Sequence, residues 1–585
     1  MVITYQNLNE KNLNLDLYLR LLKKTSKDRF SPQDLRKIEG AFEYARLAHK
    51  SQKRFSGEPY INHVVNVSLD AAALKLDADT ISAALLHDTV EDHVATMRDI
   101  KKGFGDEVAF LVRGVTKVDK LKYRGVERAA ESMRRMFLAV AEDIRVVVLK
   151  LLDRLNNMKT LYALPSEEKQ KRIASETLEI YAPLADRLGM GELKNELEDL
   201  AFRYVYPQEY EWVKKEIGGR LPERERYINK IMPVLKKELA TENIKPLEIA
   251  ARAKHYYSAW KKLLRYEMNW EKVLDLVAVR IIVKNVEDCY SALGAIHKLW
   301  RPVPGRIKDY IALPKPNGYK SLHTTVFCLD GQPTEFQIRT TEMHREAEYG
   351  IAAHWFWDEA GRPKSGAKFT GQKFFWVKQL QSWQKEFMQE QSSEEFLESL
   401  KIDFFKDRIF VLTPKGDVLD LPEGSTPIDF AYHIHSEIGH HATGAKVNSK
   451  MAPLSTTLAS GDTVEIIIKK NRKPSAEWLN FVKTSLARSR IKKELGITRP
   501  SKKIDQNETE LNVVVKNRVG VLKDITEALA AFKINIESVS SAAKGNKYPL
   551  IALKFKRKNL EQLERLKTRL KKIKGVESVA EKFKP

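Results

Sequence analysis

Apolar residues recur every three or four positions from Ser31 to about Tyr204, a spacing that predicts a run of helices. Two of these segments, DADTISAALLHDTVED and EDIRVVVLKLLDRLNNMKTLYAL, open on acidic residues that favour a helix N-terminus and carry one continuous apolar stripe. The pattern changes between about Ile231 and Trp357, where VLDLVAVRIIV and TEFQIRT have residue patterns typical of strands and lie between helical segments. It therefore predicts an all-α block followed by an α/β block.

Two smaller units follow. The first has strand patterns in DRIFVLTP, DVLDLP and DTVEIIIK around the helical segment PIDFAYHIHSEIG. The last unit has the order β, α, β, β, α, β of a ferredoxin-like fold. A length of 585 residues agrees with about three to five domains. The predicted boundaries are 1–200 for the helical block, 201–375 for the α/β block, 376–404 for a connecting helix, 405–468 for the small β unit, 469–507 for a basic helical linker and 508–585 for the C-terminal unit.

Composition narrows the class of protein. Hydrophobic residues make up 43% of the chain and charged residues 31%, as in globular proteins. No stretch approaches the roughly 18 apolar residues of a membrane helix, and the N-terminus lacks a signal-peptide pattern, so we expect a cytoplasmic protein with no membrane partner. The two cysteines, Cys289 and Cys328, are too few for a disulfide framework or a four-cysteine zinc site.

The formal net charge of +23 is concentrated near the C-terminus. Residues 469–503 contain 12 Lys or Arg against 2 Asp or Glu, and residues 541–585 contain 14 against 4. Residues 1–468 carry only about +5. Such a basic region suits a polyanion such as RNA, although Lys-rich helices are as often only a solvated surface.

Four side chains of the helical block form a candidate metal site, namely His63, the adjacent pair His87 and Asp88, and Asp153. They fall on three predicted helices, where the apolar stripe faces the interior. Imidazole and carboxylate together suit a divalent ion such as Mn²⁺ better than structural zinc. A His-Asp dipeptide alone is more often a hydrogen-bonded core pair. Here Glu91 and Asp92 lie one turn further on and can orient or deprotonate a water molecule, a pattern that indicates hydrolysis of a phosphate ester.

The strings HKSQKRFSGEPYINH, LLHDTVED and LLDRLNNMKTL, followed by ETLEIYAPLADRLGMGELKNELEDLAFRY, closely resemble the hydrolase half of the bifunctional RelA/SpoT homologues, the long Rel enzymes. The resemblance implies an HD-type Mn²⁺ site that removes the 3′-pyrophosphate of (p)ppGpp. It assigns the metal ligands to His63, His87, Asp88 and Asp153, water activation to Glu91 and Asp92, and nucleotide contacts to Arg54, Asn157 and Thr160. Two positions depart from the family sequence. Asn156 stands where the family string DRLHNM has His, and Asp186 stands where the family string APLAHRLG has His. Neither is a family metal ligand, so hydrolysis remains the expectation.

A second group of candidate residues opens the α/β block. Lys254, Ser258 and Lys262 are four residues apart, which predicts one helical face near Arg252 with several donors for a triphosphate. A lone basic helix face is more often a solvated surface.

Further polar residues fall on predicted strands of the same block. Asp275 lies within an apolar strand pattern, where a charge needs a cation such as Mg²⁺ and its nucleotide. Glu335, Gln337 and Arg339 alternate, so a strand would point them to one face, although such a face is usually exposed sheet surface. Between them GRIKDYIALPKPNGYKSLHTT reads as a Pro- and Gly-punctuated loop suited to gripping a nucleotide. No GxxxxGK[ST] motif is present, so side chains would hold the phosphates.

This block is again similar to Rel enzymes, now to their (p)ppGpp synthetase domain, which moves the β,γ-pyrophosphate of ATP to the ribose 3′-OH of GDP or GTP. The resemblance implies that Asp275 holds Mg²⁺, that Glu335 is a Mg²⁺ partner and the base for the 3′-OH, and that Tyr319 stacks on guanine. It assigns ATP contacts to Arg252, Lys254, Ser258 and Lys262, and further acceptor and phosphate contacts to Lys308, Lys315, Asn317, His323, Gln337 and Arg339. Residues 306–309, RIKD, have the RxKD form associated with bifunctional members. Ala253 replaces the Pro of the family string RPKH, which should leave the following Lys in place.

The C-terminal units resemble a TGS domain, over DRIFVLTPKGDVLDLPEGSTPIDFAYHIHSEIGHHATGAKVNSK, and an ACT domain. In long Rel proteins the TGS domain contacts deacylated tRNA on the ribosome, which implies His440, rather than His435, as the tRNA contact; the alternative is that either histidine caps a helix end. No cysteine follows Cys328, so we do not expect the Cys-rich module of full-length members, and ribosome contact would depend on the basic region. The ACT loop NRVGV, with Gly520 opening a helix, is the usual place for a small ligand, although it is as often a packing turn. Self-association through the ACT unit is a further expectation.

The predicted fold class is a multidomain chain with an all-α HD-type hydrolase domain, an α/β nucleotidyltransferase-like synthetase domain, a small β-grasp TGS domain, a short basic helical segment and a C-terminal ferredoxin-like ACT domain. The expected function is synthesis of (p)ppGpp from ATP and GDP or GTP, and its hydrolysis, with C-terminal regulation. The alternatives are a hydrolase-dominant enzyme, a ribosome- or tRNA-binding regulator with one inactive site, or an HD phosphohydrolase of other nucleotides.

Overall fold

The computed structural model describes most of the chain. The described residues are 14–26, 29–91, 94–116, 143–270, 277–315, 317–356, 408–470, 472–497, 508–516, 520–532, 534–542, 550–556 and 560–581, with the single residues Val273, Ser399 and Asp403. The chain divides into two compact units, Met1–Glu494 and Leu495–Pro585. The predicted connecting helix over 376–404 lies almost wholly outside the described residues.

The first block is helical, as predicted. Ser31 and Thr96 each begin a helix with a capping box, in which the hydroxyl accepts a hydrogen bond from the backbone N–H of an Asp three residues on and the Asp carboxylate accepts one from the cap's own N–H. The helices are α1 (Leu15–Ser26), α2 (Pro32–Ala48), α3 (Ile61–Ala73), α4 (Ala78–Glu91), α5 (Met97–Phe104), α6 (Asp106–Val115), α8 (Arg145–Lys159), α9 (Glu167–Glu176), α10 (Ala182–Arg187) and α11 (Gly191–Val205).

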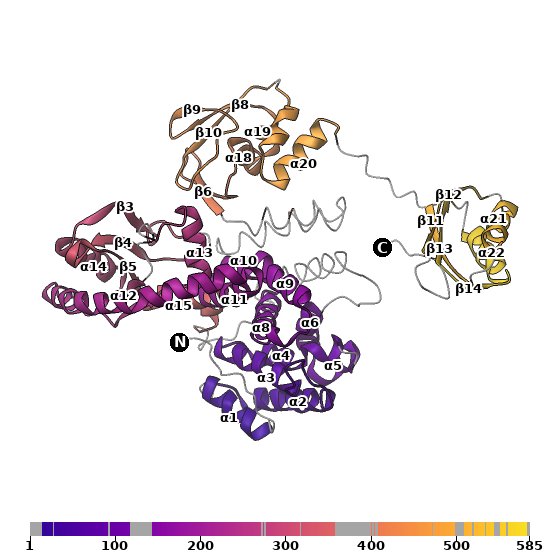
Figure 1. Cartoon of the computed structure of the whole chain (residues 1–585), viewed down its shortest axis with the longest axis horizontal. Coiled ribbons are helices and arrows are strands. Elements are labelled where there is room, and N and C mark those ends of the chain that lie inside the picture. The colour runs from indigo at the N-terminus through magenta and orange to yellow at the C-terminus, as the bar shows by residue number, and fades with distance from the viewer. Residues whose placement is uncertain are drawn as a thin grey trace. The chain divides into compact units, whose positions relative to one another are not determined.

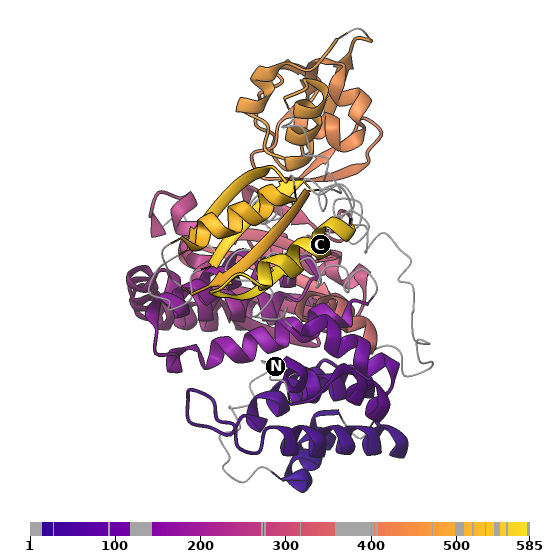
Figure 2. The same cartoon turned by 90° about the vertical axis from the view of Figure 1, so that its right-hand side faces the viewer.

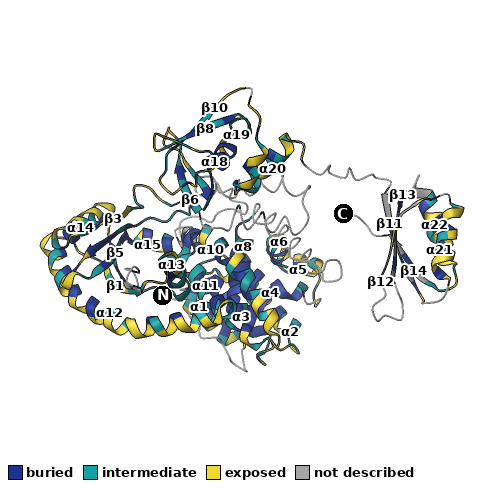
Figure 3. Ribbon diagram, turned by 45° about the horizontal axis from the view of Figure 1, so that its top comes forward, coloured by how far each residue is buried: buried dark blue, intermediate teal, exposed yellow. Residues whose placement is uncertain are grey.

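Helices α3, α4 and α8 form the centre of this block (Figure 1). Most of their residues are buried, as the dark ribbon in Figure 3 shows. A helix with little exposed surface is stable only inside a protein, against other apolar helices. Many polar residues of these three helices are buried with them, and they include the four predicted metal ligands.

The second block is α/β, as predicted, around a five-stranded sheet. Its strands lie in the order β1-β2-β5-β4-β3, with β2 and β5 parallel and the other neighbours antiparallel. The elements are α12 (Pro207–Thr241), β1 (Glu248–Ala253), α13 (Tyr256–Arg265), β2 (Val277–Val283), α14 (Val286–Leu299), β3 (Pro302–Asp309), β4 (Leu322–Phe327), β5 (Pro333–Thr340) and α15 (Thr341–Tyr349).

The sheet has one apolar face and one polar face. Helices α12 and α14 cover the apolar face and pack with Phe336 and Ile338 of β5 in one core. Glu335 and Gln337 alternate with these residues, so they lie on the opposite face, as the sequence pattern predicted. The prediction of one loop over 305–325 was wrong at its ends, because they pair as β3 and β4 and only the turn between them is irregular.

A small β unit follows, together with part of the basic stretch. Asp429 of α18 accepts hydrogen bonds from the backbone N–H groups of Lys483 and Thr484, and Trp478 and Ile491 are buried. Part of the basic stretch is therefore folded against this unit. The elements are β6 (Arg408–Leu412), β7 (Val418–Pro422), α18 (Pro427–Ile434), α19 (Ser436–His440), β8 (Ala442–Val447), β9 (Lys450–Ala452), β10 (Val464–Ile468) and α20 (Ser485–Glu494).

The C-terminal unit has the predicted ferredoxin-like order. Its sheet runs β12-β13-β11-β14 with all neighbours antiparallel. Both helices cover one face of this sheet, which is seen edge-on in Figure 1 and behind the helices in Figure 2. The elements are β11 (Glu508–Val515), α21 (Val521–Ala531), β12 (Ile536–Ala542), β13 (Leu550–Lys556), α22 (Leu560–Lys571) and β14 (Val576–Glu581). None of the helices among the described residues has the length and hydropathy needed to cross a membrane.

Gly350, directly after α15, allows a close backbone contact with the helical block. Its φ is +57°, and a Cβ added there would lie 2.0 Å from the carbonyl oxygen of Leu188 and 2.6 Å from the nitrogen of Met190. We expect Gly350→Ala to lower the free energy of unfolding by at least about 2 kcal/mol, because the backbone must move apart. Denaturant unfolding followed by circular dichroism measures this. Gly218→Ala in α12, where nothing lies within 4 Å, is the control and should stabilise by about 0.5–1 kcal/mol; equal effects of the two substitutions would contradict the close-contact role.

Candidate active sites

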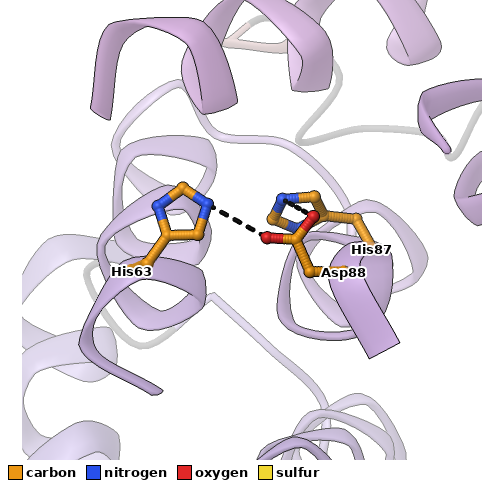
Figure 4. Close-up of side chains that lie close together, drawn as sticks. All are labelled: His63, His87 and Asp88. Atoms are coloured by element: carbon orange, nitrogen blue, oxygen red, sulfur yellow. Dashed lines mark ion pairs between the residues drawn. The ribbon is translucent and has the colours of Figure 1, made fainter. Parts of the chain in front are cut away.

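The four predicted metal ligands meet inside the helical block. His63 lies on α3, His87 and Asp88 on α4, and Asp153 on α8, and all four are at most 8% exposed. His63 Nε2 lies 3.3 Å from Asp88 Oδ2 and 3.4 Å from Asp153 Oδ1, and His87 Nε2 lies 3.3 Å from Asp88 Oδ1. Figure 4 shows the contacts of the Asp88 carboxylate with both imidazoles. Two nitrogens and two carboxylates therefore converge on one point.

The donor set fits a divalent cation. His87 Nδ1 lies 2.8 Å from the carbonyl oxygen of Ala84, so this nitrogen carries a proton and Nε2 is the nitrogen that faces the carboxylates. His87 Nε2 is buried and makes no hydrogen bond to any residue that the structure describes. Ligand atoms of His63, His87 and Asp88 all lie within 4.8 Å of one another. A buried nitrogen without a partner among carboxylates suits a metal ligand better than a core contact.

Electrostatics in this cluster keep the carboxylates charged. Burial alone raises the pKa of Asp88 and Asp153, but the two histidines, together with Lys150 in the case of Asp153, outweigh burial and lower both pKa values. Burial lowers the pKa of His87, yet Asp88 and Asp153 raise it to a net value of about 9. Two ionised carboxylates are thus available to a cation, and His87 holds a proton in its place.

The predicted nucleotide contacts of this block lie beside the ligands. Arg54 donates from Nη2 to Asn157 Oδ1 at 2.7 Å, and Asn157 Nδ2 donates to Asp153 Oδ1 at 2.5 Å. Thr160 is the C-cap of α8, one turn beyond Asn156. The structure thus brings Arg54, Asn157 and Thr160 to the same end of α8. Glu91 is the last residue of α4, and Asp92 lies outside the described residues.

Three further polar residues belong to this site and were not predicted as part of it. Tyr60 donates from its hydroxyl to Asp88 Oδ2 at 2.7 Å, and Lys150 donates from Nζ to Asp153 Oδ2 at 2.9 Å. Lys150 is only 6% exposed, so its charge must be paired. The third residue is Asn156, which lies between Arg54 and His63. A signal did exist for Lys150, because a Lys three residues before an Asp shares its side of a helix.

The second candidate site lies on the polar face of the five-stranded sheet. Glu335 Oε1 accepts a hydrogen bond from Gln337 Nε2 at 2.9 Å and lies 3.3 Å from His323 Nδ1. Burial raises the pKa of Glu335, but His323, Gln337 and Lys262 outweigh burial and lower it to about 2. This carboxylate is therefore ionised and suited to a metal ion, whereas its basicity toward a proton is low in this arrangement. In the antiparallel pairing of β3 with β4, Lys308 lies opposite His323.

A cluster of aromatic side chains lies beside Glu335. The Tyr319 hydroxyl and His323 Nε2 are 2.8 Å apart, and Lys315 Nζ lies 4.9 Å from the ring centre of Tyr310 and 5.1 Å from that of Tyr319. Burial lowers the pKa of Lys315. Asn317, nearby, donates from Nδ2 to the carbonyl oxygen of Asp186 in the helical block. The turn between β3 and β4 thus holds the predicted guanine-stacking residue Tyr319 within reach of the Glu335 face.

The predicted ATP contacts surround the start of α13, with one correction. Ser258 and Lys262 lie one turn apart on α13, but Lys254 lies before the helix, because the N-cap His255 is extended with a ψ of 145°. The prediction that all three share one helical face was therefore wrong for Lys254, which belongs to the turn between β1 and α13.

Helix α11 of the helical block holds this segment through acidic residues. Glu192 forms an ion pair with Arg252, and Glu198 with Lys261 at 3.0 Å. Asp199 accepts a hydrogen bond from the backbone N–H of Tyr257 at 2.9 Å, and its other oxygen lies 2.9 Å from His255 Nδ1. One helix thus orients both the end of β1 and the start of α13.

Arg339 is placed differently from its predicted partners. It is 1% exposed, and its Nη2 lies 3.2 Å from Glu348 Oε1 of α15 rather than against Glu335. Arg280 and Arg252 lie 3.3 and 3.7 Å from the same oxygen. Three guanidinium groups therefore lie around the carboxylate of Glu348. No sequence pattern had indicated that Arg280 and Glu348 belong to this charged cluster. Asp275 lies outside the described residues.

The two histidines of the small β unit differ in their surroundings. His435 is the N-cap of α19, and its Nδ1 accepts a hydrogen bond from the backbone N–H of Glu437. His440 ends α19, with Nδ1 3.2 Å from the Tyr432 hydroxyl. The capping alternative therefore holds for His435.

Four family models match consecutive parts of the chain. They are described as an HD domain for residues 41–191, a region found in RelA / SpoT proteins for 251–362, a TGS domain for 409–468 and an ACT domain for 505–580. These matches agree with the predicted fold class in kind and in order.

Similar curated proteins carry names for two activities. The chain is 51% identical over 465 residues to a guanosine-3′,5′-bis(diphosphate) 3′-pyrophosphohydrolase of Aquifex aeolicus and 48% identical over 463 residues to a GTP pyrophosphokinase of Myxococcus xanthus. It is 45% identical over 468 residues to the bifunctional (p)ppGpp synthase/hydrolase SpoT of Escherichia coli. These matches cover 79%, 78% and 80% of this chain, and 65%, 60% and 66% of the relatives. The chain thus spans about two thirds or less of their length.

The raised pKa of His87 predicts that binding of a divalent cation, with Mn²⁺ as the probe, releases a proton. A metal ligand must be neutral, and His87, with a pKa of about 9, is protonated near neutral pH. Mn²⁺ affinity should therefore rise with pH until about pH 9. Isothermal titration calorimetry in two buffers of different ionisation enthalpy measures the proton released per ion. Equal heats in both buffers near neutral pH, with Mn²⁺ bound, would contradict the prediction.

Proposed function

We propose that the chain is a member of the RelA/SpoT family that both makes and hydrolyses (p)ppGpp in the cytoplasm. In synthesis the β,γ-pyrophosphate of ATP passes to the 3′-OH of GDP or GTP, which yields AMP and (p)ppGpp. In hydrolysis water cleaves the 3′-pyrophosphate ester and yields GDP or GTP and pyrophosphate. The observation that carries the proposal is that one chain contains a buried two-histidine, two-carboxylate cluster and, separately, a polar sheet face around Glu335.

In the hydrolase site we assign the divalent cation, Mn²⁺, to His63, His87, Asp88 and Asp153. When bound, the ion would act as a Lewis acid and lower the pKa of a water molecule. Glu91 and Asp92, at and just beyond the end of α4, would take the proton of that water. Arg54, Asn157 and Thr160, gathered at the end of α8, would hold the nucleotide. Lys150 and Tyr60 would keep the two carboxylates in place.

In the synthetase site we assign Mg²⁺ to Asp275 and Glu335. When bound, the ion would neutralise charge on the ATP phosphates. The low pKa of Glu335, about 2, supports the ligand role, and the role as base for the 3′-OH requires that Glu335 lose its contact with His323. ATP contacts fall to Arg252, Lys254, Ser258 and Lys262. Acceptor and phosphate contacts fall to Lys308, Lys315, Asn317, Tyr319, His323, Gln337 and Arg339.

We assign regulation to the C-terminal units. His440 lies in the small β unit, which would meet deacylated tRNA. The basic stretch folded against this unit would contact ribosomal RNA. Lys469, Lys470, Arg472 and Lys473 are all exposed and precede Trp478, which anchors the stretch. The ACT unit would serve in self-association or in binding a small ligand.

The two-site proposal predicts separable losses. Glu335→Gln should lower synthesis by at least about 100-fold and spare hydrolysis, because it removes a charge from one site only. Asp88→Ala should do the reverse. Synthesis is measured with labelled ATP and GDP in Mg²⁺, and hydrolysis with labelled ppGpp in Mn²⁺, by thin-layer chromatography. Wild-type protein that neither makes nor consumes ppGpp would exclude the proposed function.

Glu225→Gln, an exposed change on α12, is the matched control and should leave both rates unchanged. Circular dichroism checks that each variant is folded. Loss of both activities in either folded active-site variant would argue against two independent sites.

The basic stretch predicts salt-dependent RNA binding. Each phosphate contact adds about 0.7 to the slope of log affinity against log salt for single-stranded RNA. We expect the double substitution Lys469→Gln with Lys470→Gln to weaken binding and to reduce this slope by about 1.4. Fluorescence anisotropy with labelled RNA over a salt series measures the slope. The same double change at Lys23 and Lys24, two exposed residues of α1, is the control; identical slopes for the two variants would show that the stretch does not contact RNA.

A further inference from the structure

Asn156 lies between a predicted nucleotide contact and a predicted metal ligand. It is on α8, three residues beyond Asp153, and is 3% exposed. Its Oδ1 accepts a hydrogen bond from Arg54 Nη1 at 2.8 Å and lies 2.6 Å from His63 Nδ1. His63 is itself 2% exposed, so no solvent competes for either contact.

The chemistry of these partners determines where the protons are. A guanidinium group can only donate, so the amide atom that faces Arg54 must be the oxygen. A carbonyl oxygen can only accept, so His63 Nδ1 must carry a proton to bond to it. The other nitrogen, Nε2, is then the one with the lone pair, and it faces Asp88 and Asp153 at 3.3 and 3.4 Å. Arg54 therefore orients the Asn156 amide, and the amide selects the tautomer of His63.

The second histidine of the cluster also carries a proton on Nδ1, for a different reason. His87 Nδ1 bonds to the backbone carbonyl of Ala84 in its own helix, an acceptor that no side-chain substitution removes. His63 has a side chain as its acceptor. The orientation of one metal ligand thus depends on a single replaceable residue, as is common for groups that support a metal site.

An asparagine can do here what the histidine of the family string DRLHNM cannot. Each imidazole nitrogen offers at most one lone pair, and a neutral imidazole has one accepting nitrogen in all. The carboxamide oxygen of Asn156 has two lone pairs and accepts from Arg54 and His63 together. The departure of this chain from the family text therefore connects two groups through one atom.

We propose that Asn156 is a positioning residue that, oriented by Arg54, holds His63 with Nε2 as the metal-binding nitrogen. This inference rests on the proposed hydrolase function, in which His63 is a metal ligand. Loss of the acceptor oxygen would leave His63 free to present a protonated nitrogen to the cation.

Mn²⁺ binding to the full chain without nucleotide tests the proposal, with electron paramagnetic resonance of free Mn²⁺ as the readout. Asn156→Leu keeps the size and removes the acceptor, and it should weaken Mn²⁺ binding by about 10- to 100-fold. Asn156→Asp keeps an acceptor oxygen and should bind Mn²⁺ at least as tightly as the wild-type protein. A merely structural role for Asn156 would predict no such rescue.

Arg54→Met tests the orienting step. It should weaken Mn²⁺ binding in the wild-type background, where the amide then turns freely. It should have a smaller effect in the Asn156→Asp background, because both carboxylate oxygens accept and no orientation is needed. Equal effects in the two backgrounds would overturn the role of Arg54.

Ser82→Ala is the matched control. Ser82 is buried on α4 and donates its hydroxyl to the carbonyl of Ala78 in its own helix, so its loss should leave Mn²⁺ affinity unchanged. Circular dichroism checks that every variant is folded. Wild-type-like Mn²⁺ binding by Asn156→Leu, or equally weak binding by Asn156→Asp, would overturn the inference alone. Absence of Mn²⁺ binding by the wild-type protein would overturn both the inference and the proposed hydrolase function.

Discussion

Burial of charge in a protein interior is the constraint on which both candidate sites depend. Asp153 is 4% exposed inside an apolar helical core, and it is tolerated because Lys150 and Asn157 donate to it and two imidazoles lie beside it. Arg339 is 1% exposed, and its buried charge is tolerated because it forms an ion pair with Glu348. An unpaired buried ion costs several kcal/mol, so each of these groups requires its partners in place. The polar networks are thus conditions of the fold as well as parts of the sites.

Helix α11 joins the two blocks through the same principle. Its apolar residues, among them Leu193 and Leu197, belong to the core of the helical block. Its acidic residues Glu192 and Asp199 hold the end of β1 and the start of α13, where the predicted ATP contacts lie. Because a helix presents different residues on each side, one element completes the core of one block and orients the charged segment of the other. A displacement of α11 would therefore change both.

Sequence patterns predicted the four residues of the candidate metal cluster but not the groups that support them. His63, His87, Asp88 and Asp153 could be found because each stands within a distinct motif on a helix with a clear period. Tyr60 and Asn156 belong to no such motif, since their partners come from other segments of the chain. The predicted helical face of Lys254 failed because a strand ends and a helix begins at His255, a boundary that spacing alone does not reveal. The contact between Arg280 and Glu348 depends on the pairing of β2 with β5 and on the position of α15, which follows β5 in the chain.

The sequence by itself determined the order and class of the domains, the apolar and polar faces of β5, and the residue types from which the two sites are built. These follow from periodicity and local chemistry, which act over a few residues. Only the tertiary structure decided that Asn156 lies between Arg54 and His63, that Arg339 binds Glu348 and that α11 holds the start of α13. Such contacts join residues far apart in the chain, and their distances depend on the packing of whole elements, to which no local pattern responds.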